Sequence, residues 1–466
     1  MMHLQRGIKR MNKNIDATKG SISESILKLA WPIIVVNLVQ VIYNFADTFW
    51  VSRLYNSTEA IAAVTITFSL VFVLISLAGG LAVATGTLSS QFFGAGQYRK
   101  VEDVAYTSMI LMGGFSIIIS IVGIGFNRQL LSLLNTPDNV MPYAIQYFNI
   151  MMGGMLFMFS FFLLSGVLRG IGDTHTPMVI GVISGVLNVI LDPLIMFGIG
   201  PFPALGIRGA AYATVISKGV VSIYLLYVLF KGKLNLKLKV KNIKMDMGIV
   251  KQLVKIGLPA GITQVVISMG GIVIMGRVNM FGDIAAAAHG IGQRLDSLLF
   301  MPAMGFNQAA AIAVGQNLGA GERERAKQSG VYAIKVTFYT LIAISAFLFV
   351  FPELFLRIFS NEQEVIALGV YYVRFLTVAF AFVGCRIVMN GIFQGAGAAF
   401  LSMVLSIVSL WGLRIPLAYL FSYTALGVRG LWLGVGVSFV ISAFVMYIWF
   451  KKGTWMDKAI VKKESD

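Results

Sequence analysis

One stretch decides the fold of this chain: Trp31-Pro-Ile-Ile-Val-Val-Asn-Leu-Val-Gln-Val-Ile-Tyr-Asn-Phe-Ala-Asp-Thr-Phe-Trp50. It is the first long apolar run, and Asn37, Gln40, Asn44 and Asp47 recur within it every three or four residues. In a helix this spacing places all four side chains on one face, which must turn toward other helices or water. Because a carboxylate on such a helix is costly, Asp47 is a candidate functional residue. The alternative is hydration at the far membrane surface, since Asp47 lies about 30 Å along the predicted helix.

The composition places the chain among integral membrane proteins. Hydrophobic residues make up 57% of its 466 residues and charged residues only 12%, and the apolar runs continue almost from end to end. The net charge of +17 does not indicate nucleic-acid binding, because the basic residues separate apolar segments instead of lining one face. The single cysteine, Cys385, excludes an internal disulfide framework. Residues 1–24 are basic and precede an apolar run too long for a cleaved signal peptide, so we expect a retained first span.

Twelve apolar segments are long enough to cross about 30 Å of hydrocarbon as helices. Glycine and proline within them are no objection, because membrane helices tolerate both. The sequence therefore predicts an all-α integral membrane protein with twelve transmembrane helices. The predicted spans are 25–52, 58–84, 103–126, 140–168, 177–199, 206–230, 250–276, 283–314, 328–351, 364–393, 399–421 and 427–450.

The distribution of lysine and arginine predicts how the chain crosses the membrane. Twenty-four of these residues fall in tails, connections and adjoining span ends on the side of the amino terminus, and six fall in connections and adjoining span ends on the opposite side. The cytoplasmic connections of multi-pass proteins carry the excess of positive charge. We therefore expect a multi-pass protein of the cell membrane with both termini in the cytoplasm.

An internal duplication determines the expected architecture. Four short segments recur in the same order at offsets of 221 to 227 residues: Leu27–Pro32 with Val254–Pro259, Gln91–Gly96 with Gln316–Gly321, Ser165–Gly172 with Asn390–Gly397, and Ala204–Gly209 with Ala425–Gly430. Each copy holds six predicted spans, so the second copy begins on the same side of the membrane and the repeats are parallel. The fold is thus expected to consist of two pseudo-symmetric six-helix lobes.

The duplication also gives the expected domain boundaries. They are an N-terminal tail (1–24), an N-lobe (25–230), a linker (231–249), a C-lobe (250–450) and a C-terminal tail (451–466). The lysine-rich linker is interpreted as an orientation signal and a hinge between the lobes. A site for anionic lipid is the alternative interpretation of the same lysines.

The two copies differ at their membrane-embedded carboxylates. Asp47 aligns with Ile274, and Asp192 aligns near Arg414 or Ile415, depending on where the gap falls. Both acidic residues of the first copy therefore lack acidic counterparts in the second. An asymmetric pair of this kind indicates a function that only the first lobe performs.

The surroundings of Asp192 resemble those of Asp47. Asp192 lies about 22 Å into the fifth predicted span, in the outer half of the bilayer, and Asn188 shares its helix face. In one interpretation Pro193 kinks the helix, and Asp192 is a partner for the backbone carbonyls that the kink leaves without hydrogen bonds. In the other, two carboxylates at similar depth, each flanked by amides, form a shared site that holds a proton near neutral pH or binds Na⁺.

Four motifs resemble those of the multidrug and toxic compound extrusion (MATE) transporters, and of their DinF-like branch in particular. The motifs are Tyr43–Ser52, Leu168–Asp173, Leu187–Pro193 and Gly209–Thr214, and the resemblance extends over roughly residues 25–450. It implies two six-helix lobes around a V-shaped central cavity. It also implies the export of amphipathic, often cationic, compounds against inward H⁺ or Na⁺.

The resemblance further implies roles for individual residues. The coupling ion, H⁺ or Na⁺, would bind at Asp47, Asn188, Asp192 and Thr214. The substrate cavity would be lined by Gln40, Tyr43, Asn44, Tyr147, Ser165 and Arg294. The chain departs from the family at Ser165, where the branch often has asparagine. It also has Ile267 where a related branch has an acidic residue, so a second-lobe cation site of that type is not expected.

The sequence argues against several other activities. No Gly-x-x-x-x-Gly-Lys-Ser/Thr loop is present, so ATP hydrolysis by this chain is not expected. The three histidines lack metal-ligand spacing. We expect no enzymatic activity and no cofactor apart from the coupling ion. The expected partners are a small organic substrate and the lipid bilayer, with no nucleic acid, and the chain is expected to be a monomer.

Arginines within the second copy leave an alternative function open. Four of them lie well inside predicted spans: Arg294, Arg374, Arg386 and Arg414. Such residues snorkel to the surface or pair with an acid such as Asp296 and with backbone carbonyls. Lipid-linked oligosaccharide flippases, a related fold class, use buried cations to hold pyrophosphate, so a flippase is the alternative. A receptor or channel without coupled transport is a third possibility, against which the duplication argues. The sequence indicates neither which compound is transported nor whether H⁺ or Na⁺ is the coupling ion.

Overall fold

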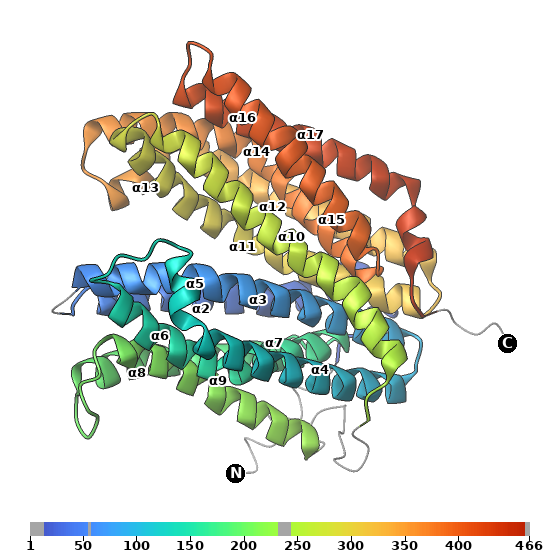
Figure 1. Cartoon of the computed structure of the whole chain (residues 1–466). Coiled ribbons are helices and arrows are strands. Elements are labelled where there is room, and N and C mark those ends of the chain that lie inside the picture. Colours follow the sequence, from blue (N-terminus) through green and yellow to red (C-terminus); the bar gives the residue numbers. More distant parts are fainter. Residues whose placement is uncertain (1–13, 55–56, 232–243, 462–466) are drawn as a thin grey trace, which may run out of the picture. The chain divides into compact units, whose positions relative to one another are not determined.

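The computed structural model describes residues 14–54, 57–231 and 244–461, and every regular element in these ranges is helical (Figure 1). The first copy of the duplication forms α2 (Ile22–Val51), α3 (Ser57–Gly94), α4 (Tyr98–Gly125), α5 (Asn127–Ser132), α6 (Met141–Gly153), α7 (Met155–Gly170), α8 (His175–Phe197) and α9 (Ile207–Phe230). The second forms α10 (Met247–Asn279), α11 (Asp283–Gly319), α12 (Arg323–Val350), α13 (Pro352–Phe359), α14 (Gln363–Gly395), α15 (Ala399–Ile407), the π-helix η2 (Val408–Arg414), α16 (Ile415–Ser422), α17 (Val428–Lys452) and the 3₁₀ helix η3 (Thr454–Lys458).

The prediction of an all-α protein with twelve membrane-spanning helices is confirmed. Within the described ranges eleven helices are each long and apolar enough to cross a membrane, with Ala399–Ser422 counted as one, and α6 with α7, taken together as one broken span, makes twelve. This pair is bent by 47°, where one helix was expected over 140–168. At the break, a Cβ added to Gly154 would stand 2.3 Å from Val215 Cγ2 of α9. A glycine there allows α9 to approach closely at the point where the span bends.

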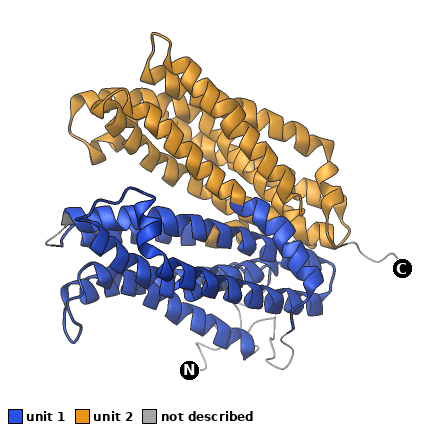
Figure 2. Cartoon of the chain, in the orientation of Figure 1, with its two compact units in different colours: residues 1–15, 35–261 blue, residues 16–34, 262–466 orange. Residues whose placement is uncertain are grey.

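The chain divides into two compact units (Figure 2). The first unit contains residues 35–261 together with the chain up to Ile15, and the second unit contains residues 16–34 and 262–466. The division falls inside α2 and inside α10, so each of these helices begins in one unit and ends in the other. Because α2 and α10 are the first spans of the two repeats, both copies make the same exchange.

The exchanged helix segments pack against glycines at equivalent positions. In the first unit, a Cβ added to Gly80 of α3 would stand 2.3 Å from the Gly257 carbonyl oxygen and 2.4 Å from the Gly261 nitrogen of α10. In the second unit, a Cβ added to Gly305 of α11 would stand 2.3 Å from Ile34 Cγ1 of α2. Gly80 and Gly305 are 225 residues apart, which matches the offset of the duplication. Close packing on small residues therefore fixes the start of each repeat.

The repeated Gln…Gly-Ala-Gly motif ends a helix in each unit. Gly96 (φ 73°) and Gly321 (φ 82°) adopt the left-handed conformation that glycine tolerates best. Within the second unit, Gln316 is fully buried, and its Oε1 accepts a hydrogen bond from the Ala17 N–H at 2.8 Å. The motif is structural: it closes α11 and ties the chain that precedes α2 to that helix.

Candidate functional site

The fully buried Asp192 lies in the last two turns of α8, directly before Pro193. Asn188, one turn earlier, is 2% exposed. Its Nδ2 donates to Asp192 Oδ1 at 3.4 Å and to Thr214 Oγ1 of α9 at 3.3 Å. The helical spacing aligns Asn188 with Asp192, and the bond to α9 completes the group. The structure thus brings together three of the four residues predicted to bind the coupling ion.

Asp47 contributes a second carboxylate from α2. It is half-buried, and its charge acts electrostatically on Asp192. Tyr43 and Tyr147 lie within electrostatic reach of both carboxylates, and Gln40 makes a side-chain hydrogen bond to Tyr43. All these residues belong to the first unit. Their proximity matches the predicted arrangement, and their roles in binding stay predictions.

Three buried oxygens of this group have no hydrogen-bond partner among the described residues. They are Asp47 Oδ1, Asp192 Oδ2 and Asn188 Oδ1. A buried polar atom without a partner is costly, so such atoms cluster where something else binds. Acceptor oxygens from carboxylates, an amide and a hydroxyl suit a proton or a hard cation. In the described ranges no group of three or more His, Cys, Asp and Glu residues could hold a metal ion, so a cation here would rely on the amide and hydroxyl oxygens as well.

The other predicted cavity residues are more scattered. Asn44 is exposed on α2, and Ser165 is buried on α7 with an Oγ that has no partner in the part of the chain that the structure describes. Arg294 is exposed on α11 and lies 5.5 Å from the centroid of the Phe359 ring. Both of these last residues belong to the second unit. The first-unit group therefore does not include Arg294.

Lys218 is a charged residue of this region that was not in the predicted set. It is 8% exposed on α9, one turn after Thr214. Its Nζ lies 4.7 Å from the centroid of the Phe161 ring and 5.6 Å from that of Tyr43. A lysine inside the predicted span 206–230 was itself a signal, because an ionisable residue within a membrane span indicates function. A positive charge therefore lies beside Tyr43, on the α9 face that also carries Thr214.

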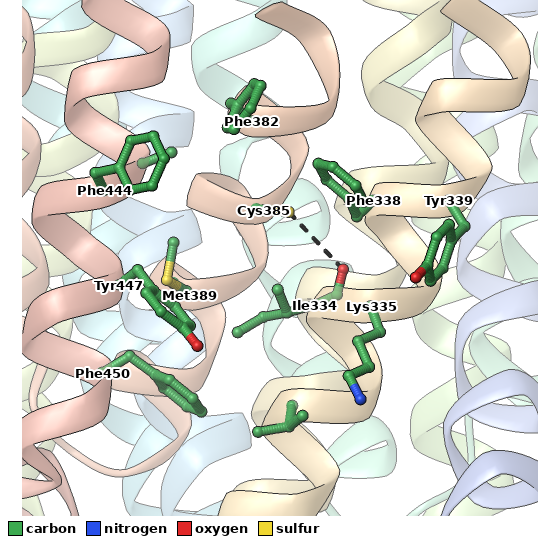
Figure 3. Close-up of a pocket in the computed structure, with 12 residues that line it drawn as sticks. Ile334, Lys335, Phe338, Tyr339, Phe382, Cys385, Met389, Phe444, Tyr447 and Phe450 are labelled. Atoms are coloured by element: carbon green, nitrogen blue, oxygen red, sulfur yellow. Dashed lines mark hydrogen bonds between the residues drawn. The ribbon is translucent and has the colours of Figure 1, made fainter.

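A cavity of about 370 Å³ lies in the second unit and is lined by residues of α12, α14 and α17 (Figure 3). Its walls are mostly aromatic and aliphatic, as Phe338, Phe382 and Phe444 illustrate. At its centre the Cys385 Sγ donates to the Ile334 carbonyl oxygen at 3.8 Å. The cluster of residues around Asp47 and Asp192 belongs to the first unit, so this cavity is not part of it.

Two six-helix repeats, the first with carboxylates among its helices, are typical of membrane transporters. The MatE family model matches residues 32–194 and 259–420, one match in each repeat. The chain belongs to this family of multidrug and toxic compound extrusion transporters. It is therefore a multi-pass membrane transporter and not an enzyme.

Individual relatives agree with this assignment. The chain is 32% identical over 443 residues to the probable multidrug resistance protein YpnP of Bacillus subtilis, covering 95% of this chain and 98% of that one. It is 29% identical over 449 residues to YoeA, a second probable multidrug resistance protein of that organism, with 96% of each chain covered. A solved MOP superfamily transporter from Pyrococcus furiosus aligns with a TM-score of 0.89 at 27% identity, covering 96% of this chain and 99% of that one. These matches do not favour a flippase, and assignment to the DinF-like branch stays a prediction.

Proposed function

We propose that this transporter is an antiporter that exports amphipathic, cationic compounds by alternating access, driven by inward H⁺ or Na⁺. The observation that carries the proposal is the set of buried oxygens without partners on Asp47, Asn188 and Asp192. A bound proton or cation stabilises a site that has two carboxylates and more hydrogen-bond acceptors than donors. The multidrug resistance relatives support small organic compounds as the exported substrates.

Ion and substrate exclude one another in this mechanism. A buried pair of charged carboxylates is costly, whereas a pair neutralised by H⁺ or Na⁺ can be enclosed. Ion binding therefore favours closure of the helices around Asp192, and a cationic substrate binds when Asp47 and Asp192 are charged. By linkage each ligand must weaken the other by the same factor, typically about 5- to 150-fold.

The direction of transport depends on the orientation of the chain. We propose that both termini face the cytoplasm of the cell and that the chain works as a monomer; the excess of Lys and Arg on one side supports this orientation. A cysteine placed at Lys244 should then react with an impermeant reagent only from inside, and one placed at Asn139 only from outside. The buried Cys385 is replaced by serine in both variants. Reversed labelling would overturn the orientation.

Transport by proteoliposomes tests the coupling. Gradients of pH and of Na⁺ are imposed separately, and uptake of the cationic dye ethidium is followed in wild type, Asp47→Asn and Asp192→Asn. We expect one gradient to drive uptake by the wild type. Both variants should fall to the background of protein-free vesicles, because an amide neither cycles a proton nor balances Na⁺.

Asp173→Asn is the matched control. Asp173 is also a buried first-unit aspartate, at 9% exposure, but both its oxygens are engaged by Thr176, through the backbone N–H at 2.9 Å and the hydroxyl at 2.6 Å. This variant should retain gradient-driven uptake. Normal uptake by both Asp47→Asn and Asp192→Asn would show that the carboxylate pair does not carry the coupling ion.

A further inference from the structure

Two arginines of the second unit, one buried and one half-buried, have no role in the mechanism above. Arg386 of α14 is 8% exposed, and Arg414, the last residue of η2, is half-buried. They lie close enough for the Arg386 charge to act on Arg414. Like charges this near one another in a membrane-embedded unit repel, and each is costly to bury unless something compensates it.

No described residue supplies that compensation in full. Neither Nε atom has a hydrogen-bond partner, and neither guanidinium forms an ion pair within the described ranges. Arg414 lies 4.3 Å above the ring of Phe439, a contact that partly offsets the cost of its burial. Arg386 lacks even a ring contact of this kind in the described chain.

One acid acts on Arg414, and one of its two carboxylate oxygens is already hydrogen-bonded, whereas Asp296 Oδ1 has no partner among the described residues. Asp296 of α11 exerts an attractive charge on Arg414, while its Oδ2 accepts a hydrogen bond from the Tyr372 hydroxyl at 2.7 Å. Two arginines and one aspartate leave the cluster with a net positive charge. One added anionic group would balance that charge and give the arginine N–H groups acceptors.

The backbone at this cluster is also unusual. Arg414 closes a π-helix that interrupts the span Ala399–Ser422 and is followed two residues later by Pro416. π-helical segments are uncommon and occur frequently at functional sites. In the first copy the equivalent region carries Asp192 before Pro193, so the duplication has placed opposite charges in corresponding regions of the two units.

We propose that Arg386 and Arg414 bind a carboxylate or phosphate group of an amphipathic compound. Planar guanidinium groups recognise such oxyanions through paired hydrogen bonds. The assignment rests on the proposed transport of amphipathic compounds, and it is independent of which ion drives export. It extends the substrate class from cations to zwitterions and anions, with the anionic group held by the second unit.

Binding of three matched probes to detergent-purified protein tests the site. Naphthylacetate and naphthyl phosphate carry the anion, and naphthylacetamide is the neutral counterpart. In the wild type at least one anionic probe should bind about tenfold or more tightly than the amide, the usual effect of a hydrogen bond to a charged group. Arg386→Gln and Arg414→Gln should remove this preference, and Arg386→Lys should retain part of it. Equal affinity of all three probes for the wild type would overturn the proposal.

Control variants test whether the preference for the anionic probes depends on Arg386 and Arg414 in particular. Arg374→Gln, on the same helix as Arg386 but exposed, should keep the preference. Asp192→Asn should also keep it while losing coupled transport, so failure of the anion site is distinguishable from failure of the coupling site. Loss of the preference in Arg374→Gln as well would show a diffuse charge effect and overturn the assignment.

Thermal unfolding separates binding from a structural role. Removing an uncompensated buried charge should raise the Tm of Arg386→Gln in the absence of probe, whereas loss of a structural contact lowers it. Competition by phosphatidylglycerol, but not by phosphatidylcholine, would identify a lipid headgroup as the source of the anion, and its absence would identify the transported compound. A lowered Tm with the probe preference intact would assign Arg386 to structure alone.

Discussion

Replacing Gly80 with alanine tests whether direct backbone contact anchors the start of α10. The new Cβ would stand 2.3 Å from the Gly257 carbonyl oxygen, 2.4 Å from the Gly261 nitrogen and 2.7 Å from the Gly261 Cα. Favourable contacts begin at about 3.5 Å, so α3 and α10 must separate locally by about 1 Å. All three obstructing atoms are backbone atoms, so no change of rotamer relieves the clash.

The expected effect on stability follows from two opposing contributions. Overpacking costs about 1–3 kcal/mol, and the higher helix propensity of alanine offsets only about 0.5–1 kcal/mol. Gly80→Ala should therefore lower the free energy of unfolding by about 1–2 kcal/mol. For a domain the size of the first unit this corresponds to a fall in Tm of about 2–8 °C.

The adjacent residue provides the control. Gly79 lies on the same helix, and a Cβ added to it would have no atom within 4 Å. Gly79→Ala should leave the Tm unchanged or raise it slightly, because only helix propensity changes. Thermal unfolding of both purified variants, followed by tryptophan fluorescence, measures the difference. A Tm for Gly80→Ala equal to that of the wild type, or an equal loss in Gly79→Ala, would falsify the backbone-contact argument.

Three further predictions use other parts of the chain. Gly305→Ala should destabilise the second unit less than Gly80→Ala destabilises the first, because the nearest obstruction is the movable Ile34 side chain; equal losses of Tm would contradict this. Asp246 precedes α10, and hydrogen bonds from the Ile249 and Gly248 N–H groups, with help from Lys100, hold its pKa below the usual range. Asp246→Ala should therefore lower the free energy of unfolding by about 1 kcal/mol at neutral pH. This difference from wild type should shrink below about pH 4 as the carboxylate protonates, and a difference independent of pH would refute the capping role. Lys218→Met should tighten binding of ethidium, because it removes a buried positive charge beside Tyr43; unchanged or weaker affinity in equilibrium titrations would contradict that interpretation.

Most of the architecture could be predicted because it depends on local patterns. Membrane spans follow from apolar length, since the bilayer allows only helices or closed barrels. The pairing of Asn188 with Asp192 follows from helical spacing along one element. The repeated Gln…Gly-Ala-Gly segments were found from the sequence as part of the duplication, and in the structure Gly96 and Gly321 at their ends adopt the left-handed conformation that glycine tolerates best.

Other features depend on packing between distant segments. The exchange of helix segments between units rests on contacts such as Gly80 with Gly257, which no local periodicity encodes. The bend between α6 and α7 arises where Gly154 meets Val215 of α9, so apolar length alone predicted one straight helix. Arg386 and Arg414 likewise lie on different helices, so their electrostatic interaction could not be predicted from the sequence.

The central claim is that Asp47 and Asp192 bind the coupling ion in competition with substrate. Equilibrium binding of ethidium to the purified protein, between about pH 5.5 and 8.5 with and without Na⁺, tests it most directly. The mechanism predicts that the affinity of the wild type falls as pH drops or as Na⁺ rises, and that this dependence disappears in Asp192→Asn but persists in Asp173→Asn. An affinity that does not change with either ion in the wild type would contradict competition at the carboxylate pair.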